Sequence, residues 1–239
     1  MTKRMLNYTP EQIEAINIVN DNLQIIACAG SGKTQVISQR IVNILKNEPS
    51  IQPQNIVAFT YTEKAAAELK SRVLKLCKEQ LPDIKGLVDM YIGTIHSWCL
   101  KVLQEHIYEY QKFSVLDDIK LKLLIDRNFN RIGMKDLNME IFKDTTYFVQ
   151  LMSIVRESKL TTPDEAIPED IRKALTNYEQ TLSDNAYFDF TMIMTKAWHH
   201  LKEDADFSAR IGNTLKYLIV DEYQDVNPIQ EYIINALVH

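Results

Sequence analysis

The fold is decided by residues 23–34, which have the sequence LQIIACAGSGKT. Residues 23–29 form a short, continuous apolar run, which is typical of a strand buried on both faces of a parallel sheet. Gly30 and Gly32 follow, two of only six glycines among 239 residues. Apolar residues then recur at helical spacing: Val36, Ile37, Ile41, Ile44 and Leu45. Glycines between a strand and a helix predict a phosphate-binding loop, because they let backbone amides close around phosphate oxygens at the positive end of the helix.

This loop departs at one position from the general pattern GxxxxGK[ST], since Ala27 occupies the first glycine position. Lys33 is expected to neutralise the β- and γ-phosphates of ATP, and Thr34 to bind Mg²⁺. The nucleotide-binding residues expected in the loop are Ala29, Gly30, Ser31, Gly32, Lys33 and Thr34.

A second chemical signal is LIVDEYQD at residues 218–225, an apolar strand pattern that ends in two acids. Such a pair would lie at the carboxyl edge of the sheet, where ligands bind in open α/β folds. Asp221 is expected to hold Mg²⁺ through water, and Glu222 to orient or deprotonate the attacking water. The alternative is that both acids are merely solvated at a strand end; the phosphate-binding loop favours the catalytic interpretation.

Strand and helix patterns alternate through the first hundred residues. Thr9, Pro10 and Gln12 predict a helix start with a hydroxyl N-cap, a proline in the first turn and a capping-box glutamine. Further strands are expected at 55–62 and 90–95, each followed by a helix, and the strand pattern returns at 215–222. Between them, about 101–210 is almost wholly helical, with breaks at 114–118, 161–169 and 183–185. The sequence therefore predicts an α/β fold, a parallel sheet with an inserted all-helical subdomain, which explains why Lys33 and Asp221 lie 188 residues apart.

The composition is that of a globular protein, with 46% hydrophobic and 25% charged residues. No apolar run reaches the roughly 18 residues of a membrane span, and residues 1–10 lack the apolar stretch of a signal peptide. We therefore expect a cytoplasmic protein with no membrane partner. The three cysteines, Cys28, Cys77 and Cys99, have no CxxC spacing and suggest reduced, buried thiols rather than disulfides or a zinc site.

The net charge of −5 argues against a globally basic nucleic-acid binder. A local basic excess nevertheless lies on the helix expected at 64–78, and consists of Lys64, Lys70, Arg72, Lys75 and Lys78. A solvated helix face remains the alternative to a nucleic-acid contact there.

Five segments resemble, in motif order, the N-terminal part of the UvrD, Rep and PcrA family of superfamily 1A DNA helicases. They are YTPEQ (8–12), ACAGSGKT (27–34), TYTEKAAAEL (60–69), GTIHSWC (93–99) and VDEYQDVNPIQ (220–230). The alanine at position 27 is itself part of the family's first motif. The resemblance extends over the whole chain.

The resemblance implies a RecA-like P-loop NTPase domain (1A) made from 1–103 and 211–239, with helical domain 1B inserted at 104–210. It implies ATP-driven translocation on single-stranded DNA with 3′ to 5′ polarity, and duplex unwinding. Gln12 is the implied adenine contact, for which helix capping is the alternative, and Gln224 is implied to couple to the γ-phosphate. The third and fourth motifs imply DNA contacts by Thr60, Tyr61, Thr62, Lys64, Thr94, His96 and Ser97. Tyr61 would be a stacking platform, unless it is a packed core residue.

Some positions depart from the family pattern. Gln35 replaces a basic residue that many relatives use to hold the nucleotide, and Thr191 and Met192 follow the family-like element YFDF (187–190) where acids are common. The second motor domain, a partner in such helicases, does not follow within 239 residues, so we expect this chain to bind nucleotide, hydrolyse it slowly and not unwind DNA alone. A nucleotide-dependent DNA-binding or adaptor module remains open, as does a P-loop kinase or small-molecule ATPase, which segments 60–69 and 221–225 disfavour.

Overall fold

The computed structural model describes residues 8–28 and 30–238 and divides into two compact units. The first unit comprises 8–28, 30–95, 209–226 and 238. The second comprises 96–208 and 227–237. Each unit is therefore built from segments that lie far apart in the sequence.

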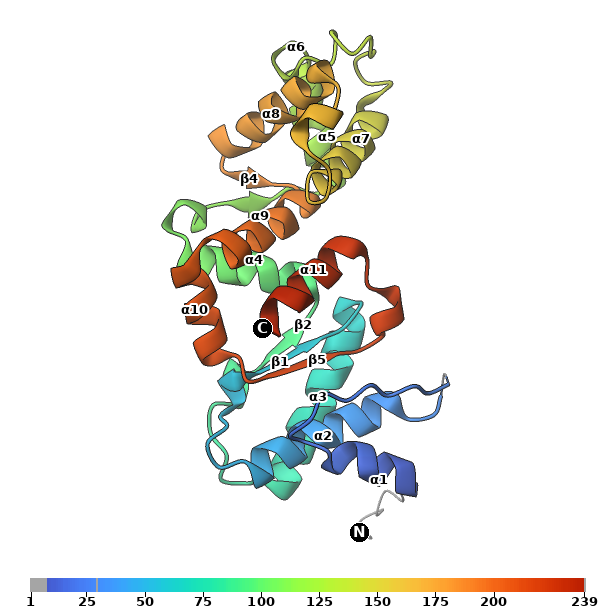
Figure 1. Cartoon of the computed structure of the whole chain (residues 1–239), viewed down its shortest axis with the longest axis vertical. Helices are drawn as coiled ribbons and strands as arrows, with labels where there is room; N and C mark the ends of the chain where they lie inside the picture. Colours follow the sequence, from blue (N-terminus) through green and yellow to red (C-terminus); the bar gives the residue numbers. More distant parts are fainter. Residues whose placement is uncertain (1–7, 29, 239) are drawn as a thin grey trace. The chain divides into compact units, whose positions relative to one another are not determined.

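The first unit combines three α-helices with a small sheet (Figure 1). Its regular elements are α1 (Pro10–Asn17), α2 (Lys33–Asn47), η1 (Pro53–Asn55), β1 (Ile56–Phe59), α3 (Glu63–Gln80), η2 (Leu87–Asp89), β2 (Tyr91–Gly93), β5 (Tyr217–Val220) and η5 (Tyr223–Asp225). The strands expected at 55–62, 90–95 and 215–222 are confirmed, with shorter bounds. The predicted capping box of α1 is confirmed as well, because the Thr9 and Gln12 side chains each accept from the other's backbone N–H.

The sheet is parallel and has the order β2-β1-β5. Phe59 is paired with Gly93 on one side and with Val220 on the other. All three strands therefore end at one edge, where the chain continues into Thr60, Thr94 and Asp221. A core of apolar side chains from α2, α3 and the strands supports this edge; it includes Ile41, Ile44, Ile56, Leu69 and Val73, none more than 1% exposed.

The strand expected at 23–29 is the main correction to the predicted fold. The structure assigns no strand to 22–28, and the Ile26 side chain is 89% exposed; Ala29 lies outside the described residues. The expected burial of this run is wrong as well, since Leu23 and Ile25 are each 36% exposed. A strand also needs a neighbour for its ladder hydrogen bonds. Within the described residues, β5 pairs with β1 alone, so the segment lies outside the sheet.

The second unit is mainly helical. Its elements are α4 (Ile95–His106), η3 (Tyr108–Tyr110), β3 (Ser114–Val115), α5 (Asp118–Arg127), α6 (Phe129–Ile132), α7 (Thr145–Ser158), η4 (Asp164–Ala166), α8 (Glu169–Asp184), β4 (Tyr187–Phe188), α9 (Phe190–Glu203) and α11 (Pro228–Leu237). Helix α10 (Ala205–Thr214) is shared, with 205–208 in the second unit and 209–214 in the first. Within the described part of the chain, none of the helices has both the length and the apolarity needed to cross a bilayer.

The second unit is not all-helical as expected, because β3 and β4 form a parallel pair. The Ser114 N–H donates to the Ala186 carbonyl (2.9 Å), and the Leu116 N–H donates to the Phe188 carbonyl (3.0 Å). Phe188 also packs on Phe113, with ring centroids 4.7 Å apart. Strand β3 falls in the predicted break at 114–118, and β4 lies just after the one at 183–185. Two strands of two residues each, about 70 positions apart, leave no periodic signal in the sequence.

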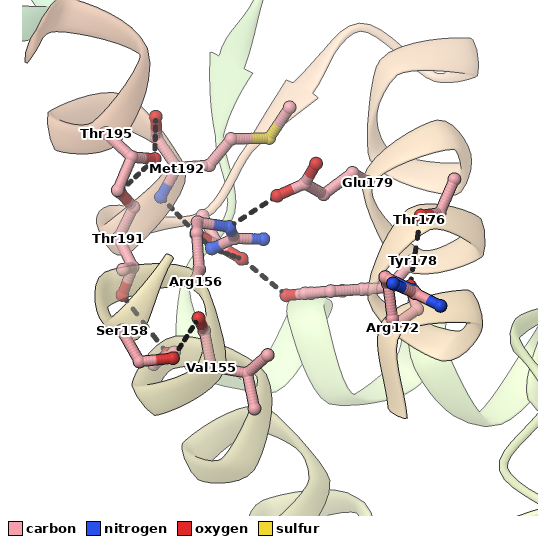
Figure 2. A network of polar contacts seen from close by, with 12 residues as sticks. Val155, Arg156, Ser158, Arg172, Thr176, Tyr178, Glu179, Thr191, Met192 and Thr195 are labelled. Atoms are coloured by element: carbon pink, nitrogen blue, oxygen red, sulfur yellow. Dashed lines mark hydrogen bonds and ion pairs between the residues drawn. The ribbon is translucent and has the colours of Figure 1, made fainter. Parts of the chain in front are cut away.

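A buried charge network joins α7, α8 and the start of α9 (Figure 2). Arg156, whose side chain is 4% exposed, donates to both carboxylate oxygens of Asp189 (2.8 and 3.0 Å) and to Glu179 (2.7 Å). Asp189 also accepts from the Tyr178 hydroxyl (2.6 Å) and, as the N-cap of α9, from the Met192 N–H (2.7 Å). Each of these groups satisfies the charge or hydrogen-bonding capacity of another. Removing one would therefore leave an uncompensated polar group in the interior, which destabilises the fold.

Candidate nucleotide site and nucleic-acid surface

The glycine loop before α2 turns through two left-handed glycines. Gly30 and Gly32 have φ angles of 78° and 90°, in the left-handed region that favours glycine. Gly32 is the N-cap of α2, so Lys33 and Thr34 occupy its first turn, where backbone N–H groups point out of the helix. Cys28, just before the loop, is exposed, so the expectation of three buried thiols is wrong for this residue.

The other two cysteines are buried, as expected. Burial raises the pKa of the Cys77 thiol to about 11, and it also raises the pKa of Cys99. Both thiols therefore stay protonated at neutral pH and contribute to packing rather than chemistry.

The acid pair lies where β5 ends. The Asp221 N–H donates to the Phe59 carbonyl (2.9 Å), which extends the β1–β5 ladder by one residue and fixes Asp221 at the sheet edge. Glu222 has a φ of 53°, a left-handed conformation that costs a non-glycine residue on the order of 1 kcal/mol. Its N–H donates to Asp221 Oδ1 (3.0 Å). The chain therefore turns sharply here, and the two acids face different surroundings.

Three residues predicted to be catalytic meet at this turn. Lys33 Nζ lies 3.2 Å from Glu222 Oε2, and Gln224 Nε2 donates to the same oxygen (2.6 Å). Gln224 also donates to Asp225 Oδ2 (3.3 Å). Lys33, the first residue of α2, and Gln224, in the segment after β5, thus contact the same carboxylate of Glu222, which is 189 positions from Lys33 in the sequence.

The two acids differ in proton affinity. Burial, with a further contribution from the Glu222 charge, raises the pKa of Asp221. The hydrogen bonds from Gln224 and Lys33 lower the pKa of Glu222. Glu222 is therefore firmly ionised at neutral pH and can accept further hydrogen bonds.

Gln12 combines two contacts. Its Oε1 accepts from the Thr9 N–H (2.9 Å) in the capping box, and its Nε2 donates to the Ser31 carbonyl (3.0 Å) in the glycine loop. A β-carbon at Gly32 would lie 3.4 Å from the same Nε2. Capping was the alternative to a nucleotide role for Gln12; the structure shows capping together with a loop contact, and the adenine contact stays a prediction.

Thr34 and Asp221 offer oxygen donors of the kind that Mg²⁺ prefers. Within the described residues, no three His, Cys, Asp or Glu side chains lie together in a way that could hold an ion. Thr34 and Asp221 would supply two oxygens, so phosphate and water oxygens would have to complete the octahedral shell of Mg²⁺.

The expected DNA-contact residues of the first unit gather at the carboxyl ends of β1 and β2. Tyr61 is 63% exposed, so its alternative interpretation as a core residue is wrong. Thr60 is buried and donates to the Thr62 carbonyl (3.1 Å), while the Thr62 hydroxyl caps α3 by accepting from the Ala65 N–H (3.1 Å). These contacts hold the backbone around the exposed ring.

Lys64 and Thr94 complete this group. Lys64 is exposed in the first turn of α3. The Thr94 hydroxyl donates to Glu63 Oε1 (2.9 Å), a contact that ties the end of β2 to the start of α3 and that the sequence did not suggest.

His96 and Ser97 belong to the second unit, in the first turn of α4. Burial lowers the pKa of His96, so its imidazole is neutral at pH 7. The ring packs edge-on against Phe190, with centroids 5.9 Å apart. His96 would therefore contact DNA as a neutral polar group rather than as a cation.

A glycine loop at a helix N-terminus, with a lysine paired to an acid at the end of a parallel strand, is the arrangement expected in nucleotide-binding α/β proteins. Residues 8–239 match the family model described as UvrD/REP helicase N-terminal domain, and the chain belongs to this family.

Relatives of known name cover nearly all of this chain. A "Probable DNA helicase II homolog" of Mycoplasma capricolum is 31% identical over 95% of the chain and 32% of its own length. A "Probable DNA helicase" of Mycoplasma pneumoniae is 30% identical over 98% of the chain and 44% of its own length. The "ATP-dependent DNA helicase PcrA" of Staphylococcus aureus is 30% identical over 98% of the chain and 32% of its own length. The chain thus spans less than half the length of each of these relatives.

Proposed function

We propose that this chain is the N-terminal motor part of an ATP-dependent DNA helicase. It would bind and hydrolyse ATP and couple hydrolysis to 3′ to 5′ translocation on single-stranded DNA and to duplex unwinding. The observation that carries the proposal is the meeting of Lys33, Glu222 and Gln224 beside the glycine loop. The polarity, and the need for a second motor domain, rest on family resemblance.

The nucleotide phosphates would lie at the N-terminus of α2. Backbone amides of the loop would donate to phosphate oxygens, and the Lys33 ammonium would move from Glu222 to the β- and γ-phosphates. The Thr34 hydroxyl and, through water, Asp221 would hold Mg²⁺, which when bound neutralises phosphate charge. The loop residues in this role are Ala29, Gly30, Ser31 and Gly32.

Glu222 would orient the attacking water and accept its proton. Its lowered pKa keeps it ionised, and Gln224, 2.6 Å from the carboxylate, holds the acid in position. When Lys33 turns to phosphate, Glu222 loses one of the two contacts that lower its pKa. Its basicity would then rise when nucleotide is present, which suits a general base.

Single-stranded DNA would run across the ends of β1 and β2. The exposed Tyr61 ring would stack on a base, and Lys64 would contact phosphate. Hydroxyl and imidazole groups would supply further contacts from Thr60, Thr62, Thr94, His96 and Ser97. In this proposal the sheet belongs to a RecA-like domain 1A (1–103 and 211–239), and 104–210 form the inserted domain 1B.

Titration of the 239-residue chain with Mg-ATP tests the site. Lys33→Ala should weaken binding at least about tenfold, because a charge-assisted phosphate contact is lost. Lys46→Ala removes an exposed lysine from the last turn of the same helix and should leave the affinity unchanged. Equal effects of the two substitutions would overturn the site. Nucleotide-dependent DNA binding by the longest chain that carries this site, without unwinding, would instead favour the adaptor module.

A further inference from the structure

The helix that carries Gln12 has little burial of its own. Helix α1 has eight residues, of which Ile16 alone is buried (6% exposed), while Ile13 is 48% exposed. Helices shorter than about 12 residues are marginal in water without tertiary support. The position of α1 therefore depends on its contacts with neighbours, and α2 is the helix it packs against.

The C-terminal end of α1 is held by two side chains of α2. Arg40 Nη1 donates to the Ala15 carbonyl (2.8 Å) and to the Ile18 carbonyl, and Asn43 Nδ2 donates to the Ile16 carbonyl (3.0 Å). Carbonyls of a last turn have no partner within their own helix. A guanidinium also suits the negative end of the helix. Arg40 and Asn43 thus satisfy acceptors that α1 leaves open.

The chain just before α1, at Tyr8, is held by side chains from the first turns of α2. Gln35 Nε2 donates to the Tyr8 hydroxyl (2.9 Å), which in turn donates to Gln39 Oε1 (3.4 Å). Gln35 stands where many family members have a basic residue, and here its side chain supports the segment that begins the adenine motif. One helix, whose first residue is Lys33, therefore holds residues 8–18 at both ends.

Gln12 lies between these two attachments. Its Nε2 is 3.0 Å from the Ser31 carbonyl, so the contacts with α2 set the distance between Gln12 and the glycine loop. A glutamine amide can pair with adenine through one donor and one acceptor. Guanine presents two acceptors at the corresponding positions and cannot form the same pair. A shift of α1 would therefore weaken adenine binding more than phosphate binding.

We propose that Arg40 and Asn43 are positioning residues for base recognition, which set the preference for adenine over guanine nucleotides by holding Gln12 beside the glycine loop. This inference rests on the proposed function, in which Gln12 contacts the base. In this proposal Arg40 and Asn43 act through Gln12 and not by contacting the nucleotide themselves.

The test compares ATP, GTP and inorganic tripolyphosphate binding by calorimetry. Arg40→Ala and Asn43→Ala should each lower the ratio of ATP to GTP affinity by about tenfold, the order of one lost bidentate contact. Tripolyphosphate affinity should stay within about twofold. Arg40→Lys should restore part of the ratio, and Lys46→Ala, the control on the same helix, should leave all three affinities unchanged.

Gln12→Ala distinguishes base recognition by Gln12 from the positioning role of Arg40 and Asn43. If this variant keeps the wild-type preference for ATP, base recognition by Gln12 fails, and the positioning role fails with it. If Gln12→Ala loses the preference but Arg40→Ala and Asn43→Ala keep it, the positioning role alone is wrong. An equal loss of tripolyphosphate binding would also overturn it, since Arg40 and Asn43 would then support the loop as a whole. Should Arg40→Ala not fold, Asn43→Ala carries the test, with faster amide exchange of residues 12–17 as the second expected result.

Discussion

Replacing Glu222 by glutamine separates nucleotide binding from hydrolysis. The substitution removes the negative charge 3.2 Å from Lys33 Nζ but keeps an amide oxygen that can still accept from Gln224. Glu222 would be the general base, so hydrolysis should fall at least about 100-fold. ATP should bind more tightly, because Lys33 no longer has to leave a carboxylate to contact phosphate.

The gain in affinity can be bounded from the geometry. Two unit charges 3.2 Å apart in water interact by about 1.3 kcal/mol, and measured exposed pairs are worth about 0.2–1 kcal/mol. The Lys33 and Glu222 side chains are 24% and 38% exposed, so the exposed-pair value applies. Releasing Lys33 should therefore lower the Kd for ATP by up to about fivefold, and less at high salt.

The assay is calorimetric titration with Mg-ATP at pH 7.5 and low salt, combined with single-turnover hydrolysis. Glu79→Gln is the matched control, since Glu79 is an exposed carboxylate near the end of α3. It should change neither quantity. Weaker ATP binding by Glu222→Gln, or hydrolysis at the wild-type rate, would refute the roles given to Lys33 and Glu222.

Three further substitutions test other parts of the account. Tyr61→Ala should weaken single-stranded DNA binding, measured by fluorescence anisotropy, about 5- to 150-fold, which is the contribution of one stacked base. Tyr108→Ala, which removes another exposed tyrosine, should leave the affinity unchanged. Equal DNA affinities of Tyr61→Ala and the wild type would exclude stacking on Tyr61. Gly32→Ala forces a β-carbon into a φ of 90°, at a cost of about 1–2 kcal/mol, and should weaken ATP binding; unchanged calorimetry would show that the loop tolerates the strain. Asp189→Asn removes the counter-charge of buried Arg156 and should cost about 3–5 kcal/mol in urea unfolding; a loss below 1 kcal/mol would contradict the network.

Local patterns predicted much of the fold. The capping box at Thr9 and Gln12 involves residues three positions apart, so the sequence contains its whole geometry. The apolar spacing of α2 likewise predicts its buried face. Segment 23–28 shows the limit, because its apolar run predicted a buried strand, whereas the structure assigns no strand there and Leu23, Ile25 and Ile26 are exposed. The β3–β4 pair was not predicted because strands of two residues each leave no periodic signal.

The candidate site was predictable in its residue types but not in its contacts. Lys33 and Glu222 were singled out by separate motifs, yet their 3.2 Å contact depends on the left-handed turn at Glu222, which the sequence does not signal. The exposure of Tyr61 decided between two interpretations that the strand pattern left open. The sequence gives no signal for the roles of Arg40 and Asn43, because a polar residue on an amphipathic helix resembles any solvated one until the carbonyls opposite it are known.

DNA-dependent ATP turnover tests the central proposal most directly. The measurement uses the longest chain that carries these residues, with and without single-stranded DNA, in wild type and Lys33→Ala. We expect turnover that rises strongly on adding DNA and is abolished by the substitution. An ATP turnover rate that does not change on adding DNA, or that is unchanged in Lys33→Ala, would contradict an ATP-driven DNA motor built on this site.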